Sequence, residues 1–290
     1  MKIVRSEDSR FAPCGEGAAR RLLTDFLKAR RAALQPADVG LPPGSPQRRT
    51  PGLRRSEVAQ LAGISTEWYT LFEMGRDRAM STRVIEPVSR ALRLTEVERE
   101  YLTDLVRAEL PPQPSLELAP ALCKLLEDDE KLVIVFDRWL TAVRWNAPAE
   151  ALFSLDRADE RTTNLLWRVQ LAGCPEWESH LRFFVGLFRR ALGRDPANRE
   201  AHRILTSLEN SATFRGIWER HEVHSLDEES RVLRHPLRPF ITGFGEIRYF
   251  TVGLPVPASA GGHVRIAVPA DDASRAALRQ LTSEQALLSA

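Results

Sequence analysis

The chain has 290 residues, and because domains average on the order of 150 residues we expect two of them. Hydrophobic residues make up 43% and charged residues 28%, which is ordinary for globular proteins and excludes collagenous, disulfide-rich and wholly disordered chains. No stretch approaches the roughly 18 uncharged apolar residues of a membrane-spanning helix, and the start MKIVRSEDSRF lacks the apolar stretch of a secretory signal. We therefore expect a cytoplasmic protein with no membrane partner.

The sequence lacks the residue patterns of the common metal, cofactor and catalytic sites. Cys14, Cys123 and Cys174 are far apart and in no zinc-binding spacing, so we expect buried or inert thiols. His221 and His224 form an isolated HxxH pair without a third ligand nearby, which is weak support for a metal. No GxSxG, HExxH, P-loop or GxGxxG motif is present. We therefore expect no metal, no cofactor and no enzymatic activity.

Charge is distributed unevenly, although the formal net charge is only +2. Residues 1–110 carry 19 basic and 15 acidic side chains, whereas residues 111–290 carry the other 22 basic and 24 acidic ones. Such a basic excess either binds phosphates or is a solvated arginine-rich surface. It is sharpest between residues 18 and 55, where only Asp25 and Asp38 oppose Arg20, Arg21, Lys28, Arg30, Arg31, Arg48, Arg49, Arg54 and Arg55.

The first 110 residues predict five helices. A loop over residues 37–52 is rich in proline and glycine, which cannot continue a helix. Ser65 is suited to cap a helix because its hydroxyl can accept an unpaired backbone N–H. Apolar periodicity predicts helices over residues 18–34, two short helices from Leu53 broken at Gly63-Ile64-Ser65, a helix over residues 82–92 kinked at Pro87, and one opening at Thr95 and ending before Pro111.

The two short helices around Gly63 favour a helix-turn-helix, whose second helix enters the major groove of DNA. A plain helical hairpin in an interaction domain is the alternative. The inward face of the second helix would hold Ile64, Tyr69 and Phe72. We expect bases and phosphates to be contacted by Arg48, Arg49, Arg54, Arg55, Ser65, Thr66, Glu67, Thr70, Leu71 and Arg76, with Met74 and Arg78 near them.

After a proline-rich linker at residues 111–114, the pattern changes from helical to mixed. Asn146 is predicted to cap a helix with Pro148 in its first turn. The remaining predicted elements are a hairpin of strands at 132–136 and 140–145 through Asp137-Arg138, helices at 164–170, 175–192, 198–209 and 213–221, strands at 231–234, 247–254 and 264–268, and a helix from Asp272.

Aromatic residues concentrate in this second part, with 15 of the 21 beyond residue 130. They either line an apolar cavity or simply fill the core. As a cavity wall we predict Trp145, Trp167, Phe184, Phe188, Phe214, Trp218 and Tyr249, with Arg168 or His221 as a polar anchor for a carboxylate-like end.

Several segments resemble one family of bacterial regulators. RRTPGLRRSEVAQLAGISTEWYTLFEMGRDR is similar to the helix-turn-helix of the xenobiotic-response-element (XRE) class, in the subset with an MmyB-like second domain. DVGLPPG at 38–44, RWN at 144–146, EW at 176–177, SATFRGIWERH at 211–221 and RHP at 234–236 resemble the same subset. The resemblance implies a dimeric transcription factor whose PAS-like second domain binds small apolar, often fatty-acid-like, molecules.

The recognition segment departs from the family pattern. Leu71 and Met74 stand where such proteins usually have Arg and Gln, which removes two base-edge donors. Because an Arg–guanine pair contributes about 1 to 3 kcal/mol of discrimination, we expect weaker specificity or an operator read through a thymine methyl. Ala79-Met80 and Pro87 are also atypical.

Together these observations predict an α+β protein. Residues 1–110 would form an all-α, five-helix DNA-binding domain, and residues 115–290 a mixed PAS-like ligand-binding and dimerisation domain. The partners would be double-stranded operator DNA, a small apolar effector of the fatty-acid type, and a second copy of the chain. The alternative is a second domain that is a protein-interaction module without a small ligand, which a packed interior with an exposed apolar face would favour.

Overall fold

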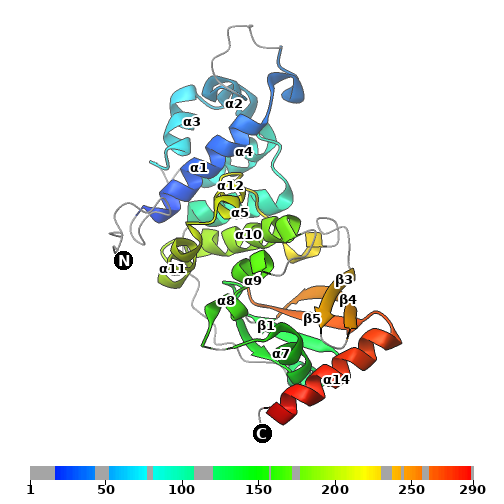
Figure 1. Ribbon diagram of the computed structural model, residues 1–290. Coiled ribbons are helices and arrows are strands. Elements are labelled where there is room, and N and C mark those ends of the chain that lie inside the picture. Colours follow the sequence, from blue (N-terminus) through cyan, green and yellow to red (C-terminus); the bar gives the residue numbers. More distant parts are fainter. Residues whose placement is uncertain are drawn as a thin grey trace. The chain divides into compact units, whose positions relative to one another are not determined.

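The computed structural model describes residues 17–42, 52–76, 81–107, 120–156, 158–171, 177–229, 237–242, 245–256 and 261–288 (Figure 1). The chain forms two compact units. Unit 1 comprises Met1–Pro111 and Arg189–His224, and unit 2 comprises Pro112–Phe188 and Ser225–Ala290. The first division lies close to the predicted boundary at residues 111–114. Residues 189–224, which follow the predicted boundary, pack with the first helices in unit 1.

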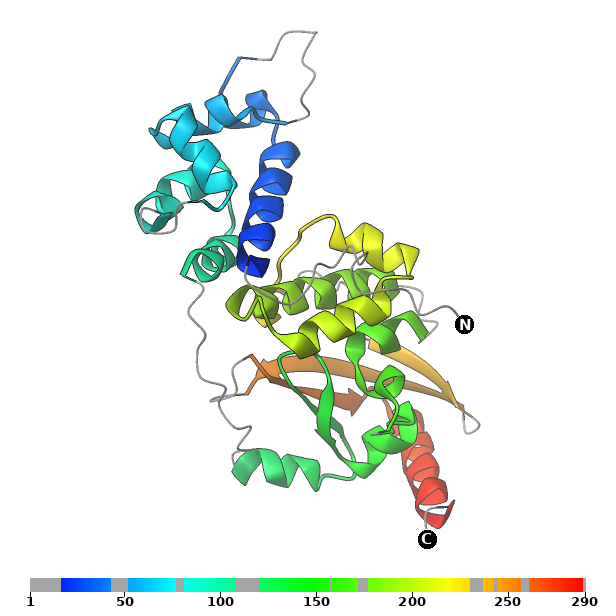
Figure 2. The same ribbon diagram turned by 90° about the vertical axis from the view of Figure 1, so that its left-hand side faces the viewer.

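The first part of unit 1 contains five α-helices, as predicted (Figure 2). A 3-10 turn, η1 (Pro36–Val39), lies in the predicted loop. The expected kink at Pro87 is replaced by a 3-10 turn, η2 (Ser81–Val84), so that Pro87 falls in the first turn of its helix, where no N–H is needed. The helices are α1 (Ala18–Ala33), α2 (Arg55–Ala62), α3 (Thr66–Glu73), α4 (Ile85–Ala91) and α5 (Glu96–Arg107).

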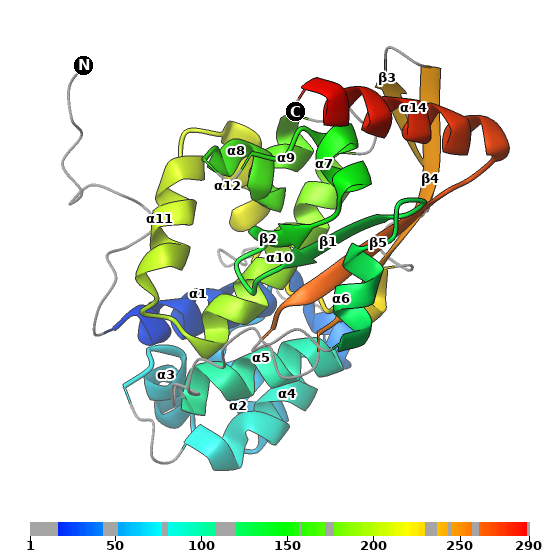
Figure 3. The same ribbon diagram turned by 90° about the horizontal axis from the view of Figure 1, so that it is seen from below.

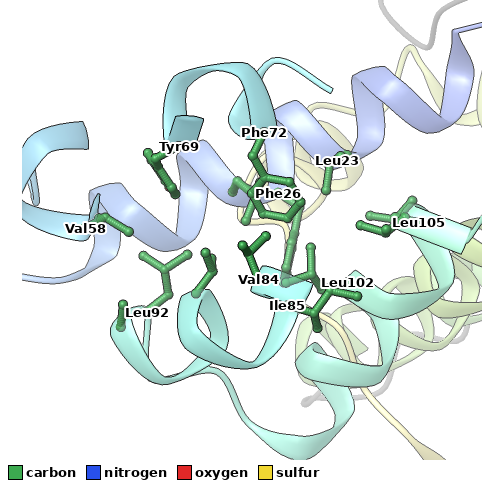
Figure 4. Close-up of a cluster of buried hydrophobic side chains, with 14 of the residues drawn as sticks. Leu23, Phe26, Val58, Tyr69, Phe72, Val84, Ile85, Leu92, Leu102 and Leu105 are labelled. Carbon is green, nitrogen blue, oxygen red and sulfur yellow. The ribbon is translucent and has the colours of Figure 1, made fainter. Parts of the chain in front are cut away.

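One apolar cluster holds these five helices together (Figure 4). Phe26 of α1 is fully buried and meets Tyr101 of α5 edge to face, with ring centroids 5.1 Å apart. From the α2–α3 pair, Val58, Tyr69 and Phe72 enter the same cluster. The orientation of α3 is therefore fixed by burial of its inward face.

Residues 189–224 complete unit 1 with the end of α10 (Trp177–Arg194), α11 (Arg199–Leu208) and α12 (Ala212–Trp218). Asn198 and Ser211 cap the last two helices, because each side chain accepts a backbone N–H. Val223 reaches the apolar cluster of the first five helices. The helix α10 begins in unit 2 and ends in unit 1.

Unit 2 is built on a five-stranded antiparallel sheet with the order β2-β1-β5-β4-β3, which confirms the α+β class. The predicted hairpin forms, but its turn extends to Thr141, and Leu140 adopts φ +65°. The strand with Pro239 was missed because proline is rare in strands, and it lies at the sheet edge. The strands are β1 (Leu132–Phe136), β2 (Ala142–Trp145), β3 (Leu237–Thr242), β4 (Gly245–Pro255) and β5 (His263–Pro269).

Helices cover the sheet of unit 2 (Figure 3). Asn146 caps α7 as predicted, accepting the N–H of Ala149. The helix α14 packs against α7 and β4, whereas α6 adds Leu122 to a cluster with Val133 and Val264 of the sheet. The helices are α6 (Pro120–Leu126), α7 (Ala147–Phe153), α8 (Glu160–Thr163), α9 (Leu165–Leu171), the first part of α10 and α14 (Asp272–Leu288), with a 3-10 turn η3 (Leu226–Glu228).

Some sequence predictions lie outside the described residues, namely the strand at 231–234, Cys14 and Cys174. Cys123 is exposed, so of the two expectations, a buried or an inert thiol, the first is wrong there and the second stays a prediction. Within the part of the chain that the structure describes, no helix is long and apolar enough to span a membrane. Within the same residues, no three His, Cys, Asp or Glu side chains gather as metal ligands would.

Candidate functional site

The helices α2 and α3 are joined by a tight turn. Gly63 takes φ +67°, a left-handed conformation that a Cβ would strain, and its N–H donates to the carbonyl of Gln60 at 3.2 Å. Ser65 caps α3 by accepting the N–H of Trp68 at 3.1 Å. The predicted turn and cap are both present, and only three residues separate the end of α2 from the start of α3.

The two sides of α3 differ in exposure. Tyr69 and Phe72 are buried, whereas Thr66 and Glu67 are exposed and Leu71 is 41% exposed. Tyr69 and Phe72 therefore differ from Thr66, Glu67 and Leu71 as predicted. Ile64, predicted inward, and Thr70 and Met74, predicted outward, are half-buried. Leu71 is among the few large apolar side chains exposed in the described residues. A leucine at such a position offers a methyl-rich surface and no hydrogen-bonding group.

A buried carboxylate lies at the end of α3. Glu73 has no exposed side-chain surface and accepts Nε–H bonds from Arg31 of α1 and Arg55 of α2, both at 2.8 Å. Burial by itself raises the pKa of Glu73, but the two arginines outweigh it and hold that pKa below its usual value. Glu73 thus ties α3 to α1 and α2. The sequence signal for it is its position four residues after Tyr69, in line with the buried side.

The predicted phosphate-contacting arginines are not equivalent. Arg55 is engaged with Glu73, and its side chain remains 39% exposed. Arg54 is exposed just before α2, where its backbone N–H donates to Glu57 at 2.6 Å. Arg76 is exposed just after α3. Arg48, Arg49, Arg78, Ala79 and Met80 lie outside the described residues.

The residues predicted to line one cavity fall into two groups. Trp145, Trp167, Arg168, Phe184, Phe188 and Tyr249 belong to unit 2, whereas Phe214, Trp218 and His221 belong to unit 1.

In unit 2, the side chain of Arg168 joins α9 to α7 and α8. Its guanidinium lies 4.8 Å from the ring centroid of Phe153 and donates to the carbonyls of Phe153 and Thr162, both at 2.8 Å. Burial lowers the pKa of Arg168 to about 10. The Phe153 ring meets that of Tyr249 edge to face at 6.1 Å. Arg168 and Tyr249 therefore both contact the ring of Phe153.

The other predicted aromatics of unit 2 differ in exposure. Phe184 and Phe188 are buried, and Phe188 meets Trp139 at 5.5 Å between centroids. Trp145 is half-buried and donates its indole N–H to Glu150 at 3.0 Å. Trp167 is half-buried with the guanidinium of Arg161 over its ring.

In unit 1, Trp218 and His221 surround a buried arginine that the sequence analysis missed. Arg189 is 1% exposed, donates to the Trp218 carbonyl, and lies 3.8 Å from the Trp218 ring centroid. Its Nη1 is 3.2 Å from Nδ1 of His221. Burial and then the nearby Arg189 and Arg30 lower the pKa of His221 to about 3, so its ring is neutral at pH 7. The sequence pattern that could have identified Arg189 is its position on the apolar side of α10, beside Phe188 and Leu192.

Arginines attach this segment to the first five helices. Arg30 of α1 donates to Glu98 at 2.5 Å and to the carbonyl of Arg220 at 2.9 Å. From α10, Arg190 pairs with Glu100, and Arg194 pairs with Asp104 at 3.0 Å.

One close approach fixes α10 against α5. A Cβ added to Gly193 would lie 2.3 Å from Cε2 of the buried Tyr101 ring. Only glycine fits this contact.

Comparison with known families agrees with this architecture. A model described as a helix-turn-helix domain matches residues 22–102. A model described as the MmyB-like transcription regulator ligand binding domain matches residues 118–281, more than half of the chain. The chain belongs to the MmyB-like transcription regulators.

Among curated proteins no relative matches the chain. The MmyB-like regulator combines a DNA-binding domain with a ligand-binding domain, and both families are regulatory rather than enzymatic. Residues 189–224 of the matched ligand-binding domain pack into the same compact unit as the helix-turn-helix.

Proposed function

We propose that the MmyB-like regulator binds double-stranded operator DNA with sequence specificity and that a small apolar effector modulates this binding. The observation that carries the proposal is the exposed side of α3, with its orientation fixed by Ser65 and Glu73. A recognition helix must project from its neighbours in a fixed orientation to read base edges. The base-contacting set is Ser65, Thr66, Glu67, Thr70 and Leu71.

Leu71 sets the expected operator chemistry. It offers only apolar contact, which suits the methyl group of thymine and not the acceptors of guanine. Thr70 donates its hydroxyl to the carbonyl of Thr66 at 2.8 Å, so towards a base it acts as an acceptor. The adjacent arginines, Arg48, Arg49, Arg54, Arg55 and Arg76, supply phosphate contacts.

The effector is proposed to be apolar and of the fatty-acid type, bound in a PAS-like unit 2. Buried aromatic side chains such as Phe184 and Phe188 support this chemistry. The division of the chain modifies the expected lining, because Phe214, Trp218 and His221 belong to unit 1. There Trp218 and His221 contact Arg189, and Phe214 stacks on Trp218. We therefore assign those three to coupling, and keep Trp145, Trp167, Arg168, Phe184, Phe188 and Tyr249 as lining.

Coupling is proposed to run along α10. This helix contributes Phe184 and Phe188 to unit 2 and Arg189, Arg190 and Arg194 to unit 1 without interruption. We propose a cytoplasmic homodimer, in which a change in α10 alters the placement of two recognition helices on half-sites about 34 Å apart.

Binding to the chain's own promoter DNA tests this function. Arg54→Ala and Arg76→Ala should each weaken binding and reduce the slope of log affinity against log salt by about 1, since each removes one phosphate contact. Arg203→Ala in α11, also exposed and arginine to alanine, is the matched control and should leave both unchanged. Promoter binding without salt dependence, or equal effects of all three variants, would contradict the proposal.

A second candidate is a protein-interaction module in unit 2. Phe250, Val252 and Leu254 of β4 and Val268 of β5 are 38–49% exposed, and an apolar sheet face of this kind suits a protein partner. Native mass spectrometry of the purified chain separates the two candidates. A co-purifying small molecule released on mild denaturation supports the effector, whereas loss of promoter regulation in Val252→Ser with no bound small molecule supports a partner.

A further inference from the structure

Two polar side chains lie side by side on the buried face of β5. His263 and Arg265 are two residues apart, so they project to the same side of the strand. Their partners in the sheet are Phe136 opposite His263 and Gly253 opposite Arg265. His263 is 1% exposed, and the Arg265 side chain is 11% exposed.

His263 has a buried nitrogen with no hydrogen-bond partner. Its ring stacks on Phe136 with centroids 5.1 Å apart and planes 16° from parallel. Nε2 is fully buried, and no group of the described residues bonds it. Burial, followed by the nearby charge of Arg265, lowers the pKa of His263 to about 3, so the ring is neutral at pH 7.

The charge of Arg265 is compensated by Glu229, but one of its guanidinium nitrogens has no hydrogen-bond partner among the described residues. Its Nη2 donates to Glu229, and Thr251 Oγ1 lies 3.4 Å from the same nitrogen. The guanidinium lies 5.2 Å from the Phe184 ring centroid. Its Nη1 is buried and has no partner among the described residues. The ion pair with Glu229 leaves one donor available and no net charge.

Gly253 provides the room for this arrangement. Its N–H donates to Glu229 at 3.1 Å, which fixes the carboxylate over the sheet. A Cβ added there would lie 2.8 Å from Oε2 of Glu229 and 3.3 Å from Nη1 of Arg265. A larger residue would displace the ion pair, so the position of Arg265 Nη1 depends on glycine at this point.

We propose that Nη1–H of Arg265 and Nε2–H of His263, in the tautomer protonated at Nε2, together donate to an uncharged oxygen-bearing group of the effector, a ketone, ester or amide carbonyl. A buried donor without an acceptor is costly, and a carbonyl oxygen supplies the acceptor. Because Glu229 already balances Arg265, a carboxylate would bring an unbalanced negative charge into the site. This inference rests on the proposed effector function. It narrows the fatty-acid type to uncharged relatives, such as an ester or an amide, and replaces the carboxylate-like end expected from sequence.

The test compares two probes with the same eight-carbon chain, 2-octanone and octanoate, titrated calorimetrically into the full chain. The wild type should bind 2-octanone more tightly than octanoate. Arg265→Met should weaken 2-octanone binding about tenfold, as expected for one lost hydrogen bond. Glu229→Gln keeps the shape of the side chain but leaves Arg265 uncompensated, so it should shift the preference towards octanoate.

Arg279→Met on α14, an exposed arginine paired with Glu130, is the matched control and should bind both probes as the wild type does. An unchanged ratio of the two affinities in both site variants would overturn the proposal, and so would absence of 2-octanone binding to the wild type. Thermal melts identify a variant that fails to fold. If Arg265→Met does not fold, the preference of Glu229→Gln between the two probes tests the proposal. Promoter binding by the same wild-type sample reports separately on the proposed function.

Discussion

Unit 1 contains two attachments that use different forces. The recognition helix α3 is held by buried apolar side chains and by Glu73, whose carboxylate is fully enclosed between two arginines. The segment 189–224 is held by Val223 in the apolar cluster, by one tight glycine contact with α5, and by the ion pairs of Arg190 and Arg194, which remain partly exposed.

This difference has a functional meaning. Buried contacts give α3 one orientation, as base reading requires. Partly exposed ion pairs contribute little each and weaken in salt, so the attachment of 189–224 is the easier of the two to change. Under the proposed function, the part of unit 1 expected to adjust is the segment 189–224, which continues from unit 2 through α10.

The largest effect is expected at Glu73. Glu73→Ala leaves two arginines without their shared carboxylate and should lower the free energy of unfolding by about 3 kcal/mol, the lower end for a broken buried pair because Arg55 is partly exposed. Urea denaturation of the full chain measures this. Glu67→Ala, on the exposed side of the same helix, is the control and should change stability by less than about 0.5 kcal/mol.

Acid should act through the same carboxylate. The pKa of Glu73 is lower in the folded chain than its usual 4.5, so its stabilisation is complete above pH 4.5 and is lost as the pH falls below that value. Glu73→Gln should lack this part of the pH dependence. Identical acid unfolding profiles for the wild type and Glu73→Gln would show that the carboxylate does not stabilise α3.

A smaller effect is expected at the glycine contact. Gly193→Ala forces a methyl group into the Tyr101 ring and should cost about 1–3 kcal/mol. Gly216→Ala in α12 is the matched control, since a Cβ there meets no atom within 4 Å, and it should stabilise the helix by up to about 1 kcal/mol. Amide hydrogen exchange in α5 and α10 should be faster in Gly193→Ala than in Gly216→Ala. Equal exchange in both variants would mean that α10 does not pack on α5.

The smallest effect is expected at the ion pairs of α10. Arg190→Ala and Arg194→Ala should each cost at most about 1 kcal/mol, because their partners Glu100 and Asp104 are partly exposed. The loss should shrink as salt is raised from low to about 1 M, since screening removes the interaction that the variants lack. Promoter binding by each variant should become less responsive to an effector, and an unaltered response would argue against coupling through this contact.

The elements that periodicity and capping specify were predictable. The turn at Gly63, the cap at Ser65, the strand 132–136 and the cap at Asn146 all follow from local rules, and all are present. The edge strand around Pro239 was missed because its place at the sheet edge, which tolerates proline, depends on distant strands.

Buried charges were the main failure of sequence reasoning. Periodicity predicts apolar residues at the positions of Glu73, Arg189 and Arg265. A charged residue at such a position is predicted to be exposed unless its partner is known. Their partners come from distant parts of the chain, Arg31 for Glu73 and Glu229 for Arg265 among them. The grouping of residues 189–224 with the first helices was missed for the same reason, because only tertiary contacts reveal it.

The inclusion of residues 189–224 in unit 1 limits how this regulator can be recombined. Exchanging only the first 110 residues would separate Glu100, Tyr101 and Asp104 from their neighbours Arg190, Gly193 and Arg194. A chimera that takes both pieces of unit 1 from the same parent keeps these contacts. Unit 1 is discontinuous in sequence, and its two pieces are therefore expected to vary together.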